Sequence, residues 1–490
     1  MVFFFAAFGL LFHILFWGIG LACLITPRRW LQFWPVFIAP AGLALQSAVV
    51  WAGAYSPLKG ANAYAWGAEI APVILLGVGW WRLGERRLSR IARDLGKFFA
   101  VWLCLGGALA MLVTPFALAS KTLTTSSLGS CDAADYAAGA RVLQEFSHGD
   151  RTGFMGLTEV VQVASVDNFF DFWLRLNHFT PSALIAFNGA ALHFQPYEII
   201  SVITALLLVL ALPVVFWVAR AGLRYGPGSS IFVMALYAMS PLTWYAVFHV
   251  AMGQLLAGPA IALVTWSGLA LWRGGASWRL GGRFAGLLAT AYWLIWGSYN
   301  FIIIVCLVPA VAFAGGHALW RGEWRRFGRW AVLMVLPLIA TGLIFTQRAL
   351  GLVERFQLFG QFDFGWKIPA LSPEGWLGLV APSLDGFSPW LRWVLSFLLV
   401  GVLILAFVRD GKRRPAGVVI ACCFTAPIIV GYCFLLVRGS LRGTNASYDA
   451  YKLFSVFYPS LLAGFCYWLT LLRGSGSVLR SVTFSWLPVC

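Results

Sequence analysis

The amino-acid sequence predicts an all-α polytopic membrane protein, and two observations support this fold class. Of its 490 residues, 60% are hydrophobic and only 11% are charged, whereas a soluble globular domain carries about 25% charged residues. Apolar runs recur along the whole chain, and each is long enough to cross a bilayer as a helix, which takes about 20 residues. The composition therefore excludes a chain of ordinary soluble domains.

We expect about 13 transmembrane helices, with a helical cap on the non-cytoplasmic side. The expected spans are residues 2–25, 36–55, 64–82, 99–119, 197–219, 231–250, 254–272, 284–297, 299–318, 330–349, 391–408, 416–437 and 453–472. The first run lacks the basic start of a signal peptide and is too long for its apolar core, so we expect a retained helix. Gly297 and Asn300 interrupt an apolar stretch, which leaves open one tilted helix or two short ones.

The basic residues predict the orientation of these helices. One set of loops holds 23 of the 35 Lys and Arg residues but only four of the 18 acidic ones, and such loops lie in the cytoplasm. These loops contain Arg28 and Arg29, 82–97, Arg220 and Arg224, 273–283, 321–329, 409–414, and Arg473 and Arg480. The net charge of +17 is thus explained by orientation, and we expect membrane lipids but no nucleic acid as partners.

Three longer polar segments then fall on the non-cytoplasmic side, at 120–196, 350–390 and 438–452. We divide the chain into N-terminal accessory helices (1–98), a middle transmembrane module (99–350) that contains the first outer segment, and C-terminal helices (351–490) with outer loops at 351–390 and 438–452.

The first outer segment has a helical pattern of its own. Tyr136, Ala140 and Leu143 fall on one face of a helix over 132–146. The apolar piece 169–179 is typical of a helix in the membrane interface, and 182–194 is apolar but too short to span. We expect this segment to form a partly embedded cap rather than a loose tail.

Two aspartates stand at the start of that helix. Asp132 and Asp135 lie where burial beside apolar surface would raise a carboxyl pKa and suit it to general-base catalysis. The alternative is structural, with Asp132 as the helix N-cap and Asp135 three residues on, as in a capping box. The spacing alone leaves both open.

A cationic site is predicted on the same side of the membrane. The outer segment "RGSLRGTNASYDAYK" supplies Arg438, Arg442 and Lys452 together with Tyr448 and Tyr451, and we expect Arg442 and Lys452 to form the site. A guanidinium and an ammonium near the membrane surface are suited to a phosphate, and we add Arg355 of the second outer segment as a further ligand. Alternatively, Lys452 only extends from its helix toward lipid headgroups.

Other ionisable residues are weaker candidates. Asp167, Asp171 and His178 could line the same cleft as Asp132 or face water. Glu69 and Glu198 lie in apolar runs, where an ionisable residue is a functional candidate. The nine cysteines and six histidines show no metal-ligand spacing, so we expect no metal site.

Several short motifs follow one another in a recognisable order. "DAADY" at 132–136 precedes "ARVLQEF" at 140–146 and "HFTPSAL" at 178–184, and then come an apolar helix, "RYG" and "ALYAMSPLTWYA" at 235–246. The run from 99 to 241, roughly a third of the chain, resembles the catalytic module of GT-C membrane glycosyltransferases, in particular the bacterial protein mannosyltransferase-like and aminoarabinose transferase-like group. It departs from their pattern at Ala133, where they have Glu, and at "HFTP", where they have Lys-Pro-Pro.

The resemblance implies an enzyme of the bacterial inner membrane, with its active site on the outer, periplasmic face. Such an enzyme moves a sugar from a polyprenyl-phosphate donor to a glycan, lipid or protein acceptor, and Asp132 would act on the acceptor as its base or would position it. No cofactor is implied, and a divalent metal is left open. The alternatives are a transporter or lipid-linked saccharide flippase, which would place polar sites at mid-membrane, and a protein like an O-antigen ligase or polymerase.

Overall fold

The computed structural model describes residues 1–84, 87–129, 131–150, 165–361, 371, 373–378, 389–443 and 447–473. Over these residues the chain is helical and has no β-strand. Eleven helices are long and apolar enough to cross a membrane, or twelve if the bent pair α12–α13 is one span. The all-α polytopic fold class is therefore confirmed. The 13 transmembrane helices predicted from the sequence also include α15 (Trp278–Gly297). This helix is long enough to cross a membrane but is not among the eleven, because it is less apolar than they are.

The N-terminal helices come first along the chain. They are α1 (Val2–Ile25), η1 (Arg28–Phe37), α2 (Ile38–Ala54), α3 (Gly60–Ala68), α4 (Ile70–Arg82) and α5 (Arg87–Lys97). α1 packs against both α2 and α4. A Cβ atom on Gly18 would overlap the carbonyl group of Ile38, so small residues permit the close approach of α1 and α2, as in other membrane helix pairs.

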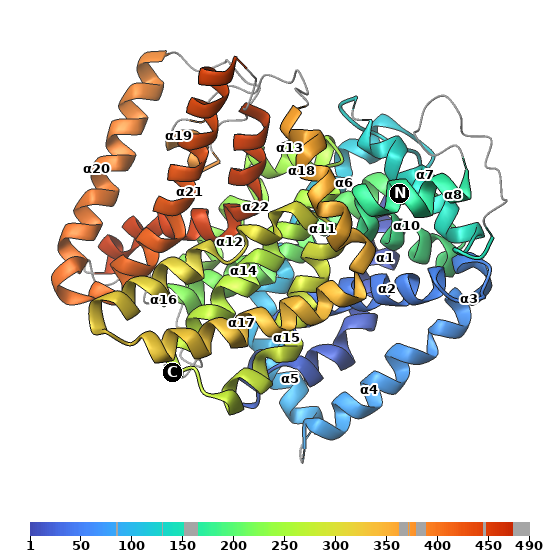
Figure 1. Ribbon diagram of the computed structural model, residues 1–490, viewed down its shortest axis with the longest axis horizontal. Coiled ribbons are helices and arrows are strands. Elements are labelled where there is room, and N and C mark those ends of the chain that lie inside the picture. The colour runs from blue at the N-terminus through green and yellow to red at the C-terminus, as the bar shows by residue number, and fades with distance from the viewer. Residues whose placement is uncertain are drawn as a thin grey trace.

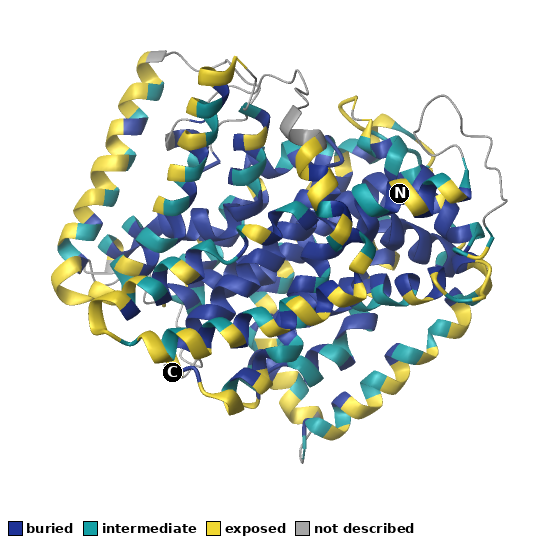
Figure 2. Cartoon of the chain, viewed as in Figure 1, coloured by how far each residue is buried: buried dark blue, intermediate teal, exposed yellow. Residues whose placement is uncertain are grey.

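The middle module contains most of the core. Its helices are α6 (Phe99–Ala119), α7 (Asp132–Glu145), α8 (Val166–Asn168), η2 (Phe169–Trp173), α9 (Leu174–Leu176), α10 (Phe179–Leu192), α11 (Pro196–Trp217), η3 (Val218–Gly222), α12 (Pro227–Met239), α13 (Pro241–Phe248), α14 (Met252–Arg273), α15, η4 (Asn300–Ile304), α16 (Val308–Arg321), α17 (Trp324–Ile344) and α18 (Thr346–Gln361). α11 and α14 are apolar all round and buried at the centre, as Figure 2 shows, which is where such helices belong.

The C-terminal helices form one end of the molecule. They are α19 (Pro373–Trp376), α20 (Pro389–Arg413), α21 (Pro415–Arg442), α22 (Ser447–Phe465) and η5 (Cys466–Arg473). α21 packs along α22, and α22 packs on α14. α20 lies at the periphery with most of its surface exposed (Figure 2), as expected for a helix that contacts lipid.

The first outer segment has the expected helices, and the pattern of α7 is confirmed. Tyr136, Ala140 and Leu143 are all buried on one face, and α7 packs on α10 and α11. The predicted helix at 169–179 is a row of three short helical pieces, α8, η2 and α9. α10 is too short to span, as expected, and is almost entirely buried within the protein.

The interruption in the apolar stretch near residue 297 separates two helices. α15 ends at Gly297, and η4 begins at Asn300 before continuing toward α16. Of the second outer segment, 362–370, 372 and 379–388 lie outside the described residues. Its first part continues as α18, which lies at the upper side of Figure 1 together with α7 and α8, whereas the basic helix α5 lies at the lower side.

A polar network inside the membrane-spanning region joins the N-terminal helices to α10. Nε2 of His13 lies 2.7 Å from Oε1 of Glu69, and Trp17 Nε1 donates to Glu69 Oε2 at 3.0 Å. Nδ1 of His13 lies 2.7 Å from Oδ1 of Asn188, whose Nδ2 donates to Gln46 at 3.0 Å. Glu69 thus has partners within the protein, which an ionisable residue in a span requires.

The orientation predicted from the basic loops can be tested by cysteine labelling. In a protein whose nine native cysteines are replaced by serine, we introduce single cysteines at exposed positions with Ser127→Cys, Gln357→Cys, Ser440→Cys, Ser89→Cys and Lys412→Cys. The first three should react with an impermeant maleimide from one side and the last two only from the other, because basic loops stay in the cytoplasm. Labelling of the variants at 127 and 412 from the same side would contradict the topology.

Candidate functional site

Asp132 is the first residue of α7, and Cys131 takes the N-cap position without a side-chain cap. The capping-box interpretation of Asp132 therefore does not describe this helix. Both Asp132 and Asp135 lie in the first turn, where the partial positive charge of the helix N-terminus favours an anion. The sequence-predicted carboxylates are thus placed at the end of α7, on a helix whose other face is anchored in the core.

Asp132 lies among basic side chains from three distant segments, two of them cationic. It interacts electrostatically with Lys452 of α22, with Arg355 of α18 and with His249, which follows α13. Burial raises the pKa of the Asp132 carboxyl, and these three groups oppose that rise without cancelling it. For Asp135, burial and the neighbouring Asp132 raise the pKa to about 6. Both carboxyls therefore ionise nearer to neutral pH than an exposed aspartate does.

Aromatic rings connect α7 to the cation of α22. The ring of Tyr136 lies 6.0 Å from that of His178, which stacks on Tyr299 at 4.7 Å between ring centroids. Lys452 Nζ lies 5.8 Å from the ring centroid of Tyr299 and 4.1 Å from that of Tyr448. These distances are typical of cation–π contacts. The ammonium is therefore held in place by two ring faces as well as by Asp132.

His178 is neutral in this arrangement. Its Nδ1 lies 2.5 Å from the carbonyl oxygen of Ser298, and a carbonyl only accepts, so Nδ1 carries the proton and donates. Burial, together with Arg355, Arg348 and Lys452, lowers the pKa of His178 well below its usual range. His178 thus serves as a packed and hydrogen-bonded ring beside Asp132, and it is unsuited to act as an acid at neutral pH.

A cavity of about 430 Å³ opens beside these groups, between η4, α18, α21 and α22. Its lining residues are Tyr299, Phe301, Ile302, Ile304, Val305, Arg355, Phe356, Leu435, Arg438, Asp449, Lys452, Leu453 and Val456. Three of them are cationic and most of the rest are apolar. Ile304 is 63% exposed and Phe356 is 46% exposed, so part of the wall belongs to the outer surface of the helix bundle, which faces lipid in a membrane.

Two arginines of α18 hold the first outer segment in place. Arg348 is fully buried and donates to the carbonyl oxygens of Trp296 at 2.9 Å, of Leu174 at 2.6 Å, and of Asn177. Arg355 donates to the carbonyl oxygen of Leu176. Arg348 is therefore structural, whereas Arg355 both supports the α9 segment and lines the cavity.

Arg442, the remaining cationic candidate, does not lie beside Lys452 in the lining of the cavity. Arg442 is exposed in the last turn of α21 and is not among the described residues that line the cavity. Arg438, one helical turn earlier, lines it. Tyr448 contacts Lys452, and Tyr451 is buried with its ring centroid 5.8 Å from that of Tyr245. The cationic end of the cavity therefore combines Lys452, Arg355 and Arg438.

Two further acidic candidates of the first outer segment, Asp167 and Asp171, lie apart from this cavity. Asp167 is exposed in the first turn of α8, and Asp171 is exposed with an oxygen 3.8 Å from Nε2 of His148. Neither lines the cavity. Glu198 is a helix cap, because its carboxylate accepts from the backbone N–H of Gln195 at 2.7 Å. Of the acidic residues selected from the sequence, Asp132 interacts electrostatically with Lys452, although Asp132 itself is not among the described residues that line the cavity.

Sequence reasoning missed three residues of the site, namely Tyr299, Phe301 and Asp449. The break at residues 298–300 was visible in the sequence, and a polar aromatic residue at a break between apolar runs is a signal for a cavity lining. Gly253 of α14 makes room for this lining, because a Cβ there would overlap the ring of Tyr299.

Comparisons with protein-family models, with curated proteins and with solved structures found no significant match. The resemblance to GT-C glycosyltransferases therefore stays a prediction from the motifs. Among the residues that the structure describes, no group of three or more His, Cys, Asp and Glu side chains is arranged to hold a metal ion.

The role of Arg348 in holding the first outer segment predicts a large loss of stability on its replacement. Arg348→Met leaves three buried carbonyl groups without their donor, and each unsatisfied group costs about 1–3 kcal/mol. Arg175→Met is the matched control, because Arg175 forms a solvent-exposed ion pair with Glu354 at 3.1 Å, and such pairs contribute about 0–1 kcal/mol. Thermal unfolding in nanodiscs should show a clearly lower Tm for Arg348→Met alone. Equal melting temperatures for the two variants would refute this role.

Proposed function

We propose that this protein is a membrane glycosyltransferase that moves a sugar from a polyprenyl-phosphate donor to an acceptor hydroxyl at the non-cytoplasmic face. The observation that carries the proposal is the cavity between η4, α18, α21 and α22, which joins apolar walls to a cationic end beside Asp132. A ligand that matches both parts is amphiphilic and anionic, and it carries its reactive group next to the charge.

The donor would bind with its prenyl chain along the apolar walls. Ile304 and Leu435 lie on that side of the cavity, and burial of hydrocarbon contributes about 25 cal/mol per Å². The phosphate would lie at the cationic end, against Lys452, Arg355 and Arg438. Guanidinium and ammonium groups make strong charge-assisted hydrogen bonds to phosphate oxygens. The donor needs no nucleotide, and the sequence offers no nucleotide-binding motif.

In the proposed reaction Asp132 acts as the general base. Its carboxylate takes the proton from the acceptor hydroxyl, whose oxygen attacks the anomeric carbon of the donor sugar. The bond between that carbon and the phosphate oxygen breaks, and the electron pair leaves with polyprenyl phosphate. Lys452 and Arg355 stabilise the negative charge that develops on the departing oxygen. Such electrostatic stabilisation of the transition state is usually the largest single contribution to the rate enhancement. A single displacement of this kind inverts the configuration at the anomeric carbon.

The environment of Asp132 supports this role. A general base works best when its pKa lies near the operating pH, and burial raises the pKa of Asp132 in that direction. Lys452, His249 and Arg355 oppose the rise and so favour the ionised carboxylate, which is the form that acts as a base. The same cations draw the phosphate to within reach of the acceptor that Asp132 activates.

A second candidate function is a proton-driven flippase of a lipid-linked saccharide. It is favoured by one observation: the intramembrane pair His13–Glu69 lies at the break between α3 and α4. Carboxylate and imidazole groups within spans form proton pathways in transporters, and transporters use broken helices. A flippase would share the donor cavity, but it would need no base at position 132.

Asp132→Asn separates the two candidates. We expect sugar transfer to fall by about 10²- to 10⁴-fold, the usual contribution of general-base catalysis, because the carboxamide cannot accept the proton. Transfer by the unmodified protein should also fall as the pH drops through the pKa of Asp132, which lies above the ordinary value of 3.8. The assay is transfer from a polyprenyl-phosphate sugar in nanodiscs, with Tm measured in parallel.

Asp135→Asn is the control for charge at the same end of α7, and it should retain most of the activity. Wild-type transfer by Asp132→Asn would remove Asp132 as the base. Lipid translocation by the unmodified protein without any transfer would favour the flippase.

The cationic end of the cavity predicts a second set of effects. Lys452→Ala and Arg438→Ala should each weaken binding of a polyprenyl-phosphate analogue by about 10- to 100-fold, because a hydrogen bond to a charged group contributes about 1.5–3 kcal/mol. Arg442→Ala is the matched control, since this exposed arginine of α21 lies outside the described lining. Affinity should be measured on folded protein in nanodiscs. If all three variants bind like the unmodified protein, the phosphate site lies elsewhere.

A further inference from the structure

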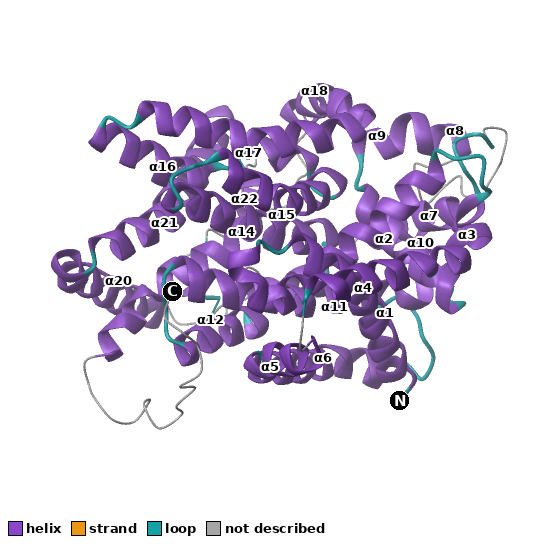
Figure 3. Cartoon of the chain, turned by 90° about the horizontal axis from the view of Figure 1, so that it is seen from below, coloured by secondary structure: helices purple, strands orange, loops and turns teal. Residues whose placement is uncertain are grey.

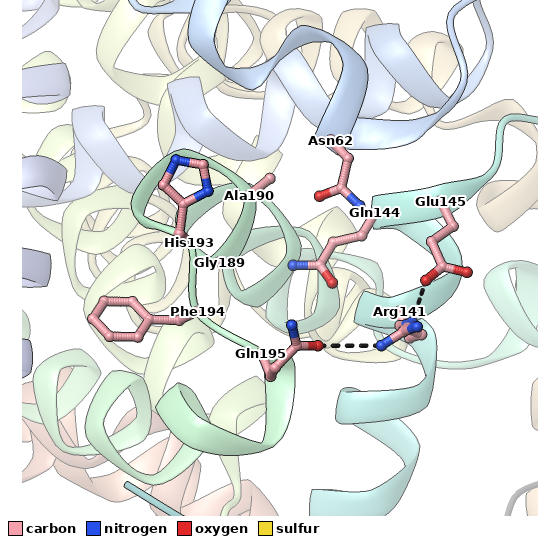
Figure 4. Close-up of a pocket in the computed structure, with 9 residues that line it drawn as sticks. All are labelled: Asn62, Arg141, Gln144, Glu145, Gly189, Ala190, His193, Phe194 and Gln195. Carbon is pink, nitrogen blue, oxygen red and sulfur yellow. Dashed lines mark hydrogen bonds and ion pairs between the residues drawn. The ribbon is translucent and has the colours of Figure 1, made fainter.

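A second pocket, of about 290 Å³, lies at the opposite end of α7 from Asp132. Figure 4 shows the residues around it, which come from α3, from the last turns of α7 and from α10 and the turn into α11. They are Asn62, Arg141, Gln144, Glu145, Gly189, Ala190, His193, Phe194 and Gln195. Its volume is at the low end of small-molecule sites, which measure about 300–1,000 Å³.

The polar side chains of this pocket are fixed by bonds to one another and to the backbone. Arg141 Nη1 donates to Oε1 of Gln195 at 3.2 Å, and Arg141 also forms an ion pair with Glu145 (Figure 4). The Gln195 backbone is held in turn by the N-terminal capping box of α11. A Cβ on Gly189 would crowd Nε2 of Gln144 at 2.6 Å. The absence of a side chain at position 189 therefore leaves room for the amide of Gln144, which donates to the carbonyl oxygen of Ala186 at 3.4 Å.

We propose that this pocket binds sugar units of a saccharide, which under the proposed function are those of the acceptor. The lining carries three carboxamides, a guanidinium, a carboxylate and an imidazole, from Asn62, Gln144, Gln195, Arg141, Glu145 and His193. Together they present donors and acceptors in several directions, as a ring of hydroxyl groups requires.

The charges in the pocket favour a neutral ligand. The positive charge of Arg141 is paired with the negative charge of Glu145, so the site carries no excess cation for a phosphate. The lining contains no aliphatic side chain larger than that of Ala190, so it is not built for a hydrocarbon chain. It thus differs in kind from the donor cavity, which is apolar and cationic.

An aromatic ring lies beside the pocket. Trp66 of α3 is 64% exposed, and its ring centroid lies 5.9 Å from that of His193. An exposed tryptophan offers a flat apolar face with a polar edge, which suits the apolar face of a pyranose ring. His193 has a left-handed backbone with φ of 58°, which turns the chain from α10 toward α11 and presents the imidazole at the rim.

The length of α7 relates this pocket to the site of chemistry. The helix has 14 residues, and at about 1.5 Å per residue its two ends lie about 20 Å apart. A saccharide in the pocket would therefore be a remote part of the acceptor, and its reacting hydroxyl would be about 20 Å away, beside Asp132. Binding energy from such a remote part can position the reacting group and so raise the rate.

The test is binding to an array of immobilised tri- to hexasaccharides by the purified protein in nanodiscs. The unmodified protein should bind a subset of the array. Asn62→Trp fills the pocket from its exposed rim and should weaken that binding at least tenfold. Ala63→Trp is the matched control, because Ala63 is the next residue of α3, is exposed, and is not among the lining residues. It should bind as the unmodified protein does.

The outcomes separate this proposal from the proposed function. No binding to any array member by the unmodified protein, or equal binding by Asn62→Trp, would overturn the sugar site whatever the transfer assay gives. Loss of array binding in Asn62→Trp supports the sugar site even if Asp132→Asn keeps full transfer activity. In that case the pocket still binds a saccharide, but the assignment of this saccharide as the acceptor would be wrong. Binding of the polyprenyl-phosphate analogue should be the same in Asn62→Trp and in the unmodified protein.

Discussion

Removing a charged side chain from water costs free energy unless a partner compensates it, and this constraint organises the end of the protein at which α7 begins. Asp132, Lys452 and Arg355 come from α7, α22 and α18, and each provides the opposite charge that another requires. The rings of Tyr299 and Tyr448 complete the surroundings of the ammonium. The compensation of these charges therefore requires all three helices to be in place.

The rest of the fold keeps α7, α18 and α22 in fixed positions relative to one another. α11 and α14 supply an apolar centre, and Arg348 ties the α9 segment to the end of α15 through backbone carbonyl groups. The N-terminal helices are joined to α10 by the network around His13 and Glu69. α7 therefore rests on helices that are themselves fixed, and its two ends face two chemically different pockets, one amphiphilic and cationic and the other polar and neutral.

Composition and periodicity were sufficient to predict the fold class and the helix that has Tyr136 on its buried face. Both predictions depend on the length of apolar runs and on residue spacing, which are local properties of the sequence. The sequence predicted that Lys452 and Asp132 lie on the same side of the membrane. It could not predict that they interact, because the charge of the loops assigns residues to one surface without determining which of them are neighbours. The structural role of Arg348 could not be predicted, because its acceptors are backbone atoms of Leu174 and Asn177, far away in sequence. The sequence predicted Arg442 as the phosphate ligand, whereas Arg438, one helical turn earlier, lines the cavity. The sequence alone does not fix which face of the helix is turned toward the cavity.

The central claim is that a prenyl chain lies along the cavity of η4, α21 and α22 with its phosphate toward Asp132. Photo-crosslinking tests it directly. A polyprenyl phosphate with a diazirine on its chain should label peptides that contain Ile304, Leu435 or Val456, which line that cavity, and excess unlabelled polyprenyl phosphate should suppress this labelling. Labelling confined to peripheral helices such as α4 and α20, and unaffected by competitor, would contradict the account.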